Sequence, residues 1–355
     1  MVLSYYLYRR PYQLLWHLMH WFRKEPQLVL YCADPVDWEI LSRLAKYLPH
    51  YSWVASGRNV RHYLDKRAVD YHQMPAFPDC VIMCRHQAHK FPVKRILKFG
   101  LRHGVYHFKK FTDPRHYRAF DRYFVTSQQE VDLARSMGIE NTVAAGFPKL
   151  DGLYDGSYSG NDLKRLREEC RLDPQKATIF FTATYEKSKM SALSLWKDRI
   201  HTLADRYNIL VTLHPWISAA KRRMLAERPG VRLIDGYELN PYMLIADVMV
   251  GDTSSLLGEF CALNKPIVTF RVPESRRSLP EITRLLDEIS TRVENFAELE
   301  QALEWISSRG DDKAAARAEA NRLLFAYRDG NSARRIADYI LRIWDSKFAG
   351  TDSLV

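Results

Sequence analysis

Residues 248–270 read VMVGDTSSLLGEFCALNKPIVTF and contain a strand, a helix and a second strand in succession. The apolar run at 248–250 predicts a buried strand, and a helix is predicted over 254–263 because leucine and phenylalanine recur on one face. The run PIVTF at 266–270 predicts the next strand. Two strands joined by a helix are typical of a parallel sheet with helices on its faces.

The same alternation continues on both sides of this stretch. Upstream, strands are predicted in ATIFFTAT, NILVTLHP and VRLID, with helices over 191–207 and 218–227 and a short helical piece around Met243. Downstream, three amphipathic helices are predicted, over 296–307, 313–327 and 333–347. Together these elements predict one Rossmann-like half of the chain.

The N-terminal half has the same organisation. Its predicted strands are QLVLYCA, YSWVAS, CVIMC, DRYFVTS and TVAAG, and its clearest helices cover 36–48 and 128–137. Between the halves, 146–161 is rich in Gly, Ser, Asp and Tyr and lacks periodicity, which predicts a linker. We therefore expect two Rossmann-like domains, at 1–149 and 150–355, with a cleft between them.

The charge of the chain indicates an acidic partner. The formal net charge is +11 at pH 7, which favours a nucleic acid, an anionic lipid or a phosphorylated substrate. The sequence contains no recognised RNA or DNA module, and its aromatic and basic residues form no stacking array. A non-catalytic nucleic-acid-binding protein is therefore the less favoured alternative, and we expect no nucleic-acid partner.

The cysteines predict core thiols. The chain has five, an odd number, and most lie in or beside apolar runs, as is typical of reduced thiols in a cytosolic protein. Cys80 and Cys84 are close together and His86 follows, but these ligands are too few for a zinc site. We expect neither a bound metal nor a cofactor.

The N-terminus, MVLSYYLYRRPYQLLWHLMHWFRK, predicts an amphipathic interfacial helix. Charged residues interrupt it too often for the roughly 20 apolar residues of a membrane span, and no signal peptide is predicted. Pro11 is expected at the first turn. The apolar stripe, which would contact an anionic membrane surface, consists of Leu14, Leu15, Leu18 and Phe22. The alternative is a helix packed on its own domain.

Ligands of parallel α/β sheets bind beyond the carboxyl ends of the strands, so the residues that follow each strand are the candidates for chemistry. After the strand at 248–250 come Asp252, Thr253, Ser254 and Ser255. Hydroxyl groups and the backbone N–H groups at a helix start suit a phosphate or diphosphate. An ordinary Ser/Thr cap is the alternative.

Two further strand ends carry polar side chains. His214 and Pro215 end NILVTLHP, and a histidine there can donate to a phosphate oxygen, although a lone histidine is more often structural. Thr182 and Thr184 end ATIFFTAT, where hydroxyls suit phosphate or ribose and where a simple turn is the alternative.

The N-terminal half carries two weaker motifs. In GLRHGVYHFKKF, His103 is a candidate general base, Gly104 permits a tight turn, and Lys109 and Lys110 follow, unless the segment is only a basic loop. At the junction of the halves, GFPKLD contains Lys149 and is either a functional motif or a turn.

These five motifs, in this order and at these separations, resemble the CDP-glycerol glycerophosphotransferase family, which includes teichoic acid primases and polymerases. The resemblance covers roughly 100–275. His103-Gly104 is similar to the family's HG motif, and 146–151 resembles its G-x-P-R-x-D. The remaining matches are 182–184 to A-P-T, His214-Pro215 to H-P, and 252–255 to D-Y-S-S, continued by Glu259 and Lys265-Pro266.

The chain departs from the family's pattern at several positions. Lys149 stands where arginine is common, and Thr253 stands where an aromatic residue is common. Val105-Tyr106 replaces Thr-Pro, Ala183 lacks the following proline, and Thr212 and Leu213 precede His214 where an arginine is often found. These departures concern contacts with donor and acceptor.

The resemblance implies a GT-B fold with the nucleotide donor in the C-terminal domain. It implies transfer of glycerol phosphate or a similar polyol phosphate from CDP-glycerol or a related nucleotide to a saccharide or lipid-linked acceptor, with release of CMP, at the cytoplasmic face of the membrane. We expect His103 and His214 to be catalytic, with His103 as the base. The expected donor-binding residues are Gly104, Lys149, Thr182, Thr184, Pro215, Asp252, Thr253, Ser254, Ser255 and Glu259.

Two other enzymes remain open on the same fold. A GT-B glycosyltransferase would use a nucleotide sugar and form a glycoside, and a nucleotide-sugar epimerase would need no acceptor.

Overall fold

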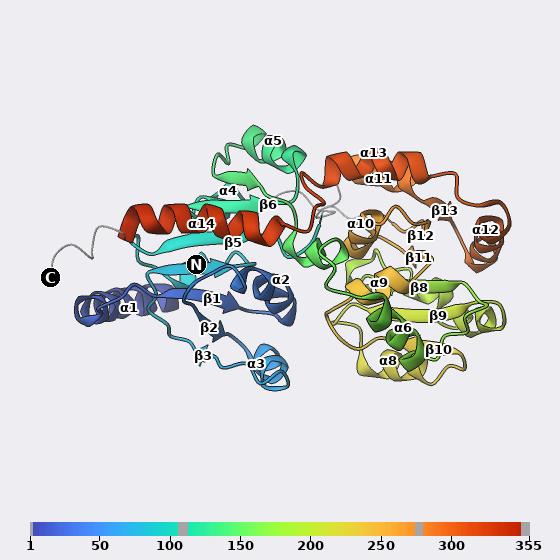
Figure 1. The fold of residues 1–355 in the computed structure, drawn as a ribbon, viewed down its shortest axis with the longest axis horizontal. Coiled ribbons are helices and arrows are strands. Elements are labelled where there is room, and N and C mark those ends of the chain that lie inside the picture. The colour runs from blue at the N-terminus through green and yellow to red at the C-terminus, as the bar shows by residue number, and fades with distance from the viewer. Residues whose placement is uncertain (1–2, 106–112, 274–279, 349–355) are drawn as a thin grey trace. The chain divides into compact units, whose positions relative to one another are not determined.

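The computed structural model describes residues 3–105, 113–273 and 280–348 (Figure 1). The chain divides into two compact units, each built on its own parallel sheet. The first unit contains Met1–His103, Phe111–Asp151 and Phe325–Val355, and the second contains Gly104–Lys110 and Gly152–Leu324.

The first unit has a parallel sheet in the order β3-β2-β1-β4-β5-β6-β7. Every residue of β1, β4 and β5 is buried, which explains why most of these strands are continuous apolar runs rather than alternating ones. The strands are β1 (Leu28–Cys32), β2 (Ser52–Ala55), β3 (His72–Gln73), β4 (Cys80–Met83), β5 (Leu97–Leu101), β6 (Arg122–Val125) and β7 (Thr142–Ala144).

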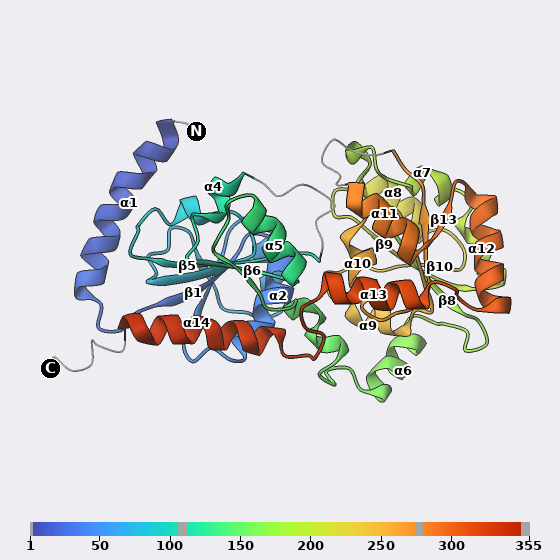
Figure 2. The ribbon, with the colours of Figure 1, turned by 90° about the horizontal axis from the view of Figure 1, so that it is seen from above.

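Helices cover this sheet. They are α1 (Leu3–Phe22), α2 (Pro35–Ala45), α3 (Arg58–Asp65), η1 (Ala88–Lys90), α4 (Pro114–Tyr117), α5 (Gln128–Ser136), η2 (Pro148–Leu153) and α14 (Ser332–Phe348). Helix α14 runs along one face of the sheet next to α2 (Figure 2). Its Tyr339 ring contacts that of Phe124 with centroids 5.5 Å apart, and Asp151 accepts hydrogen bonds from the backbone N–H groups of Ser332 and Ala333 at its start.

The division of the chain differs from the expected one in its C-terminal part. The first segment boundary falls at Asp151, close to the expected division between 149 and 150, but α14 groups with the first unit. The apolar face of α14 is buried there through Ile336, Ala337 and Ile340. A helix joins the sheet on which it can bury its apolar stripe, wherever that sheet lies in the sequence.

The second unit has a six-stranded parallel sheet in the order β10-β9-β8-β11-β12-β13, the order of a doubly wound nucleotide-binding sheet. Its strands are β8 (Thr178–Ala183), β9 (Asn208–Leu213), β10 (Val231–Leu233), β11 (Val248–Gly251), β12 (Ile267–Phe270) and β13 (Thr291–Val293). Helices α11 and α13 lie side by side on it (Figures 1 and 2). Its helices are α6 (Gly160–Glu169), η3 (Glu186–Ser188), α7 (Leu193–Trp196), η4 (Ile200–Asp205), α8 (Ala219–Ala226), α9 (Asn240–Ile245), α10 (Ser255–Cys261), α11 (Pro280–Ile289), α12 (Phe296–Arg309) and α13 (Ala314–Leu324).

Two predicted elements were wrong in form. The single helix expected over 191–207 is α7 followed by the 3-10 helix η4, because backbone bonds span three residues here, as from Thr202 N to Arg199 O. The linker expected over 146–161 contains η2 and the start of α6. Gly146 in this segment has a φ of 86° and packs so closely on Ser332 that a Cβ would clash.

Helix α1 is confirmed, but Pro11 lies inside it rather than at its first turn, because the helix already begins at Leu3. One face is anchored on the first unit: Tyr12 and Trp16 are buried, and the Trp16 indole N–H donates to the Pro78 carbonyl at 2.6 Å. Among the described residues, no helix is both long enough and apolar enough to cross a membrane. One face of α1 therefore packs on its own domain, as the alternative to an interfacial helix predicted.

The five cysteines are free and buried, as expected of core thiols. Burial raises the pKa of the Cys80 and Cys84 thiols well above the ordinary value, which favours the protonated form. Within the described part of the chain, no group of three or more His, Cys, Asp or Glu residues is arranged to hold a metal.

Candidate active site

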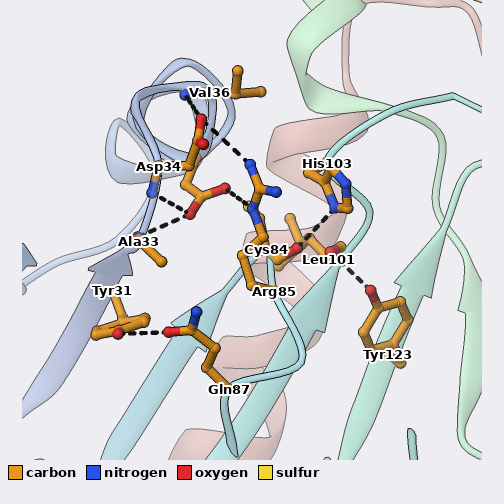
Figure 3. A network of polar contacts seen from close by, with 11 residues as sticks. Tyr31, Ala33, Asp34, Val36, Cys84, Arg85, Gln87, Leu101, His103 and Tyr123 are labelled. Atoms are coloured by element: carbon orange, nitrogen blue, oxygen red, sulfur yellow. Dashed lines mark hydrogen bonds and ion pairs between the residues drawn. The ribbon is translucent and has the colours of Figure 1, made fainter. Parts of the chain in front are cut away.

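His103 lies just beyond the carboxyl end of β5 in the first unit (Figure 3). Its Nδ1 atom is 3.2 Å from the carbonyl oxygen of Cys84, the residue that follows β4. A carbonyl oxygen only accepts hydrogen bonds, so this contact places a proton on Nδ1. In the neutral ring the lone pair is then on Nε2, which is the form that a general base requires.

The surroundings of His103 favour its neutral form. Burial, assisted by the positive charges of Arg85 and Arg102, lowers the pKa of His103 from 6.5 to about 3. Arg102 is itself buried and pairs with Glu130, their nitrogen and oxygen atoms being 2.9 Å apart. The His103 ring is therefore unprotonated at neutral pH, which leaves the lone pair on Nε2.

Arg85 is held in place by two carboxylates at the end of β1 (Figure 3). Its Nε atom lies 2.9 Å from Oδ1 of the fully buried Asp37, and a terminal nitrogen lies 3.3 Å from Oδ1 of Asp34. The second oxygen of Asp37 accepts from the backbone N–H groups of Ala33 and Asp34. The loops after β1 and β4 are thereby joined next to His103.

No motif in the sequence predicts a role for Asp37 or Arg85. Asp34 and Asp37 form a capping box at the start of α2. A capping box is a common local signal, and its link to a distant arginine is not encoded in the spacing. Only the strand order, which makes β1 and β4 neighbours, brings the two segments together.

Gly104 and Val105 group with the second unit. Gly104 is not among the residues with positive φ, so the predicted tight turn does not use the left-handed conformation. Its small size serves packing, because a Cβ at this position would lie 3.3 Å from the Ser255 hydroxyl oxygen. Val105 is buried against Gly258 of α10. Lys109 and Lys110 lie outside the described residues.

In the second unit, the fully buried Asp252 joins the loops that follow β8 and β11. Its carboxylate accepts from the Thr184 hydroxyl at 2.7 Å, from the Thr184 backbone N–H at 2.9 Å and from the Ala192 N–H at 3.0 Å. It also accepts from the N–H groups of Thr253 and Ser254. The carboxylate oxygens thus face protein donors, and Asp252 fixes the shape of this edge.

The segment after Asp252 presents hydroxyl groups. Ser254 is the N-cap of α10 and accepts from the Leu256 N–H, while Ser254 and Ser255 are both half-buried. The Thr253 hydroxyl oxygen is enclosed and has no hydrogen-bond partner among the described residues. Helix α10 is shorter than the expected 254–263, since the chain turns at Asn264 with a φ of 54°. Fewer aligned peptide dipoles than expected therefore point at its start.

His214 follows β9, and its Nδ1 atom accepts a hydrogen bond, whereas Nδ1 of His103 donates one. The donor to His214 Nδ1 is the Trp216 backbone N–H at 3.1 Å, so the proton of the neutral ring is on Nε2. Pro215 occupies the second position of a turn closed by the Ile217 N–H and the His214 carbonyl, 3.0 Å apart. Such an Nε2–H group can donate to a phosphate oxygen.

Arg222 binds the backbone of this turn, and no sequence motif predicts this role. A terminal nitrogen of Arg222 donates to the carbonyl oxygens of Leu213 and His214 at 2.8 and 2.9 Å. Arg222 comes from α8, which follows the turn directly. The backbone that carries His214 is therefore fixed from two sides.

The other expected donor-binding residues occupy different environments. Thr182 is buried in β8 and paired in register with Thr212, and Glu259 is buried in α10. Lys149 is buried in η2 and belongs to the first unit, unlike the rest of the set. In the second sheet β8 lies between β9 and β11, so Thr184, His214 and the segment after β11 share one edge.

Comparison with known proteins identifies relatives of this chain. The model of the family described as CDP-glycerol:poly(glycerophosphate) glycerophosphotransferase matches 110–342, well over half of the chain and beginning after His103. The teichoic acid ribitol-phosphate polymerase TarK of Staphylococcus aureus is 24% identical over 174 residues, 45% of this chain and 33% of that protein. The teichoic acid glycerol-phosphate primase of Bacillus spizizenii is 25% identical over 160 residues, 43% of this chain and 41% of that protein. The chain thus matches about a third to two fifths of the length of these relatives.

Solved structures show the same fold. A variant of the wall teichoic acid polymerase TagF soaked with CDPG matches with a TM-score of 0.72 and 16% identity, covering 97% of this chain and 98% of that one. The S. aureus MnaA structure with UDP matches with a TM-score of 0.63 and 13% identity, covering 90% and 97%. These likenesses and the two parallel sheets confirm the predicted GT-B fold class. The fold alone does not separate a phosphotransferase from an epimerase, whereas the family match favours the phosphotransferase.

Proposed function

This chain belongs to the CDP-glycerol:poly(glycerophosphate) glycerophosphotransferase family, and we propose that it transfers glycerol phosphate or a similar polyol phosphate from a CDP-activated donor to a hydroxyl group of a saccharide or lipid-linked acceptor. The observation that carries this proposal is the edge of the second sheet. There an Nε2–H group of His214 follows β9, and the hydroxyls of Ser254 and Ser255 follow β11, on either side of β8. Asp252 joins the loops after β8 and β11. Donors on rigid loops suit the oxygens of a diphosphate.

In the proposed reaction, His103 accepts the proton of the acceptor hydroxyl through Nε2. The hydroxyl oxygen then forms a bond to the phosphorus that carries the polyol, in line with the bridging oxygen of the diphosphate. The bond between that phosphorus and the bridging oxygen breaks, and CMP leaves with the bridging oxygen. The low pKa of His103, which burial causes, supplies the unprotonated ring that this step requires.

On the donor side, His214, Ser254 and Ser255 bind phosphate oxygens as the negative charge on CMP develops. Asp252 acts through the loops that it holds rather than by contact, since its oxygens already accept protein hydrogen bonds. The remaining proposed donor contacts are Gly104, Lys149, Thr182, Thr184, Pro215, Thr253 and Glu259.

Donor binding provides the first test. Thermal stabilisation by CDP-glycerol should exceed stabilisation by UDP-glucose, and replacing both Ser254 and Ser255 with alanine should weaken CDP-glycerol binding by roughly tenfold or more, because hydrogen bonds to charged groups contribute about 1.5–3 kcal/mol each. Ser346→Ala, on the outer part of α14, is the matched control and should bind normally. Equal stabilisation by both nucleotides would contradict the donor assignment.

We also propose that α1 holds the protein on an anionic membrane surface at the cytoplasmic face. The exposed surface of α1, beside the face that carries Tyr12 and Trp16, includes large apolar side chains: Leu7, Leu14, Leu15, Leu18, Met19, Trp21 and Phe22. Trp21 is 84% exposed and Phe22 78% exposed, and the basic residues Arg10 and Lys24 lie exposed nearby. An apolar helix face with flanking positive charge matches an anionic lipid surface.

Vesicle binding tests this second proposal. With Leu14, Leu18 and Phe22 replaced by glutamine, co-sedimentation with vesicles that contain phosphatidylglycerol should fall at least about tenfold, since each exposed side chain would lose roughly 1.5–3 kcal/mol of burial. Leu323→Gln, an exposed leucine on α13, is the control. Unchanged binding of the triple variant would contradict the proposal.

A further inference from the structure

Three aromatic rings meet beyond the carboxyl ends of β8 and β9 in the second unit. The ring of Trp216 lies 4.9 Å from that of Tyr185 and 5.2 Å from that of His214, and Tyr185 and His214 are 5.0 Å apart, centroid to centroid. Trp216 is 74% exposed. The sequence predicts a functional role for His214 but for neither of its two aromatic neighbours.

The exposed indole is held by a rigid backbone. The Trp216 backbone N–H donates to His214 Nδ1, the turn that begins at His214 is closed by Ile217, and Arg222 binds the carbonyls before and at its start. A large apolar side chain left in water forgoes about 1.5–3 kcal/mol of burial. Because the backbone at Trp216 is fixed and its ring contacts Tyr185 and His214, a ligand that covers the indole has less conformational entropy to remove.

The cluster also lies at the same edge of the second sheet as the proposed phosphate contacts. Strands β9 and β11 flank β8, so their ends are separated by about 10 Å along one sheet edge. A nucleoside diphosphate has a flat base at one end and its phosphates at the other. If the phosphates contact the segment after β11 and His214, the base extends along this edge within reach of the rings.

We propose that Trp216, supported by Tyr185, stacks on the pyrimidine ring of the donor nucleotide. This inference rests on the proposed function and adds the part of the site that binds the base. Stacking on an aromatic side chain uses the π-face that every base offers, so the rings contribute affinity, and the identity of the base is read elsewhere.

The test separates the base from the phosphates. CDP and inorganic pyrophosphate are titrated by calorimetry into the full-length protein, into Trp216→Leu and into Trp216→Phe. Trp216→Leu should bind CDP about tenfold more weakly, the usual effect of losing one stacked base, and should bind pyrophosphate as the parent does. Trp216→Phe should retain most of the CDP affinity. Because the Trp216 backbone donates to His214, these side-chain changes leave that hydrogen bond in place.

Trp305→Leu is the matched control, because Trp305 is an exposed tryptophan of the same unit on α12, away from this edge. It should bind CDP normally. Equal CDP affinity in Trp216→Leu and the parent would overturn the stacking proposal alone. Equal losses for CDP and pyrophosphate would also overturn it, since the change would then act on the phosphate contacts. Failure of the parent to bind CDP at all would overturn both this inference and the proposed function.

Discussion

Each unit carries a histidine just beyond the carboxyl end of a strand, after β5 in the first sheet and after β9 in the second, yet the Nδ1 atoms of the two rings have opposite kinds of hydrogen-bond partner. His103 Nδ1 faces a carbonyl oxygen, which fixes the proton on Nδ1, whereas His214 Nδ1 faces a backbone N–H, which leaves the proton on Nε2. One ring can therefore accept a proton through Nε2, and the other can donate a hydrogen bond through the same atom. The backbone partner, and not the residue type, assigns the chemical role.

Substitution of His103 should reduce activity more than any other change considered. His103→Ala should lower kcat by about 10²–10⁴-fold, the usual contribution of a general base, while CDP-glycerol binding is largely kept. His103→Gln should be equally inactive because an amide cannot accept the proton. Product formation from labelled donor measures both. His50→Ala, an exposed histidine of the same unit, is the control, and full activity of His103→Ala would refute the base assignment.

At His214 the same pair of substitutions should give a different pattern. His214→Ala should lower kcat/KM by roughly 10–100-fold, the loss of one hydrogen bond to a charged oxygen. His214→Gln should recover part of that loss, since its amide supplies an N–H donor of similar reach. Steady-state kinetics with the two variants measure the difference. If glutamine restores activity at position 103 but not at position 214, then His103 is the hydrogen-bond donor and His214 is the base, which would contradict the assignment.

Asp252 should stabilise the folded protein through the two loops that it joins. Asp252→Asn puts an amide NH2 among N–H and hydroxyl donors that the carboxylate now satisfies, so the free energy of unfolding should fall by about 2–3 kcal/mol. Urea denaturation measures it. The exposed Asp198 provides a control, Asp198→Asn, which should change stability little. A variant as stable as the parent would show that the carboxylate does not organise these loops.

The smallest effect is a shift of pH dependence. The folded-state pKa of His103 lies below 6.5, so the folded protein binds fewer protons there than the unfolded chain, and His103 lowers stability as pH falls from 6.5 toward about 3. Arg85→Gln removes a positive charge that lowers this pKa. The acid limb of kcat/KM should therefore move to higher pH, whereas Arg85→Lys, which keeps the charge, should leave it close to the parent profile. An unmoved limb in Arg85→Gln would contradict the electrostatic account.

The sequence predicted most strands because they are continuous apolar runs, and it missed those that are not. Strand β5, which carries His103 to its place, contains Lys98 and Gly100. The buried Lys98 ammonium group donates hydrogen bonds to the carbonyl oxygens of Val93 and Ile96. The Tyr123 ring occupies the space that a Cβ at Gly100 would need. A lysine and a glycine interrupt the apolar run, so the sequence alone predicts a loop here. The contacts that allow a buried strand come from neighbouring segments.

The candidate site, like the strands, was predictable only where a local pattern marks its residues. Residues at strand ends, such as His214 and Ser254, follow from the periodicity, because a strand end is a local signal. Asp37 and Arg85 meet through a contact that only the pairing of β1 with β4 creates. Arg222 acts on the turn that precedes its own helix, but its spacing from His214 matches no known motif. Trp216 was missed because an exposed aromatic residue in a turn has no periodic signature.

A crystal structure with CDP-glycerol bound would show the donor contacts themselves. We expect diphosphate oxygens within hydrogen-bond distance of His214 Nε2 and of the Ser254 and Ser255 hydroxyls, with the pyrimidine ring against Trp216. A nucleotide bound elsewhere, with this edge of the second sheet empty, would contradict this expectation.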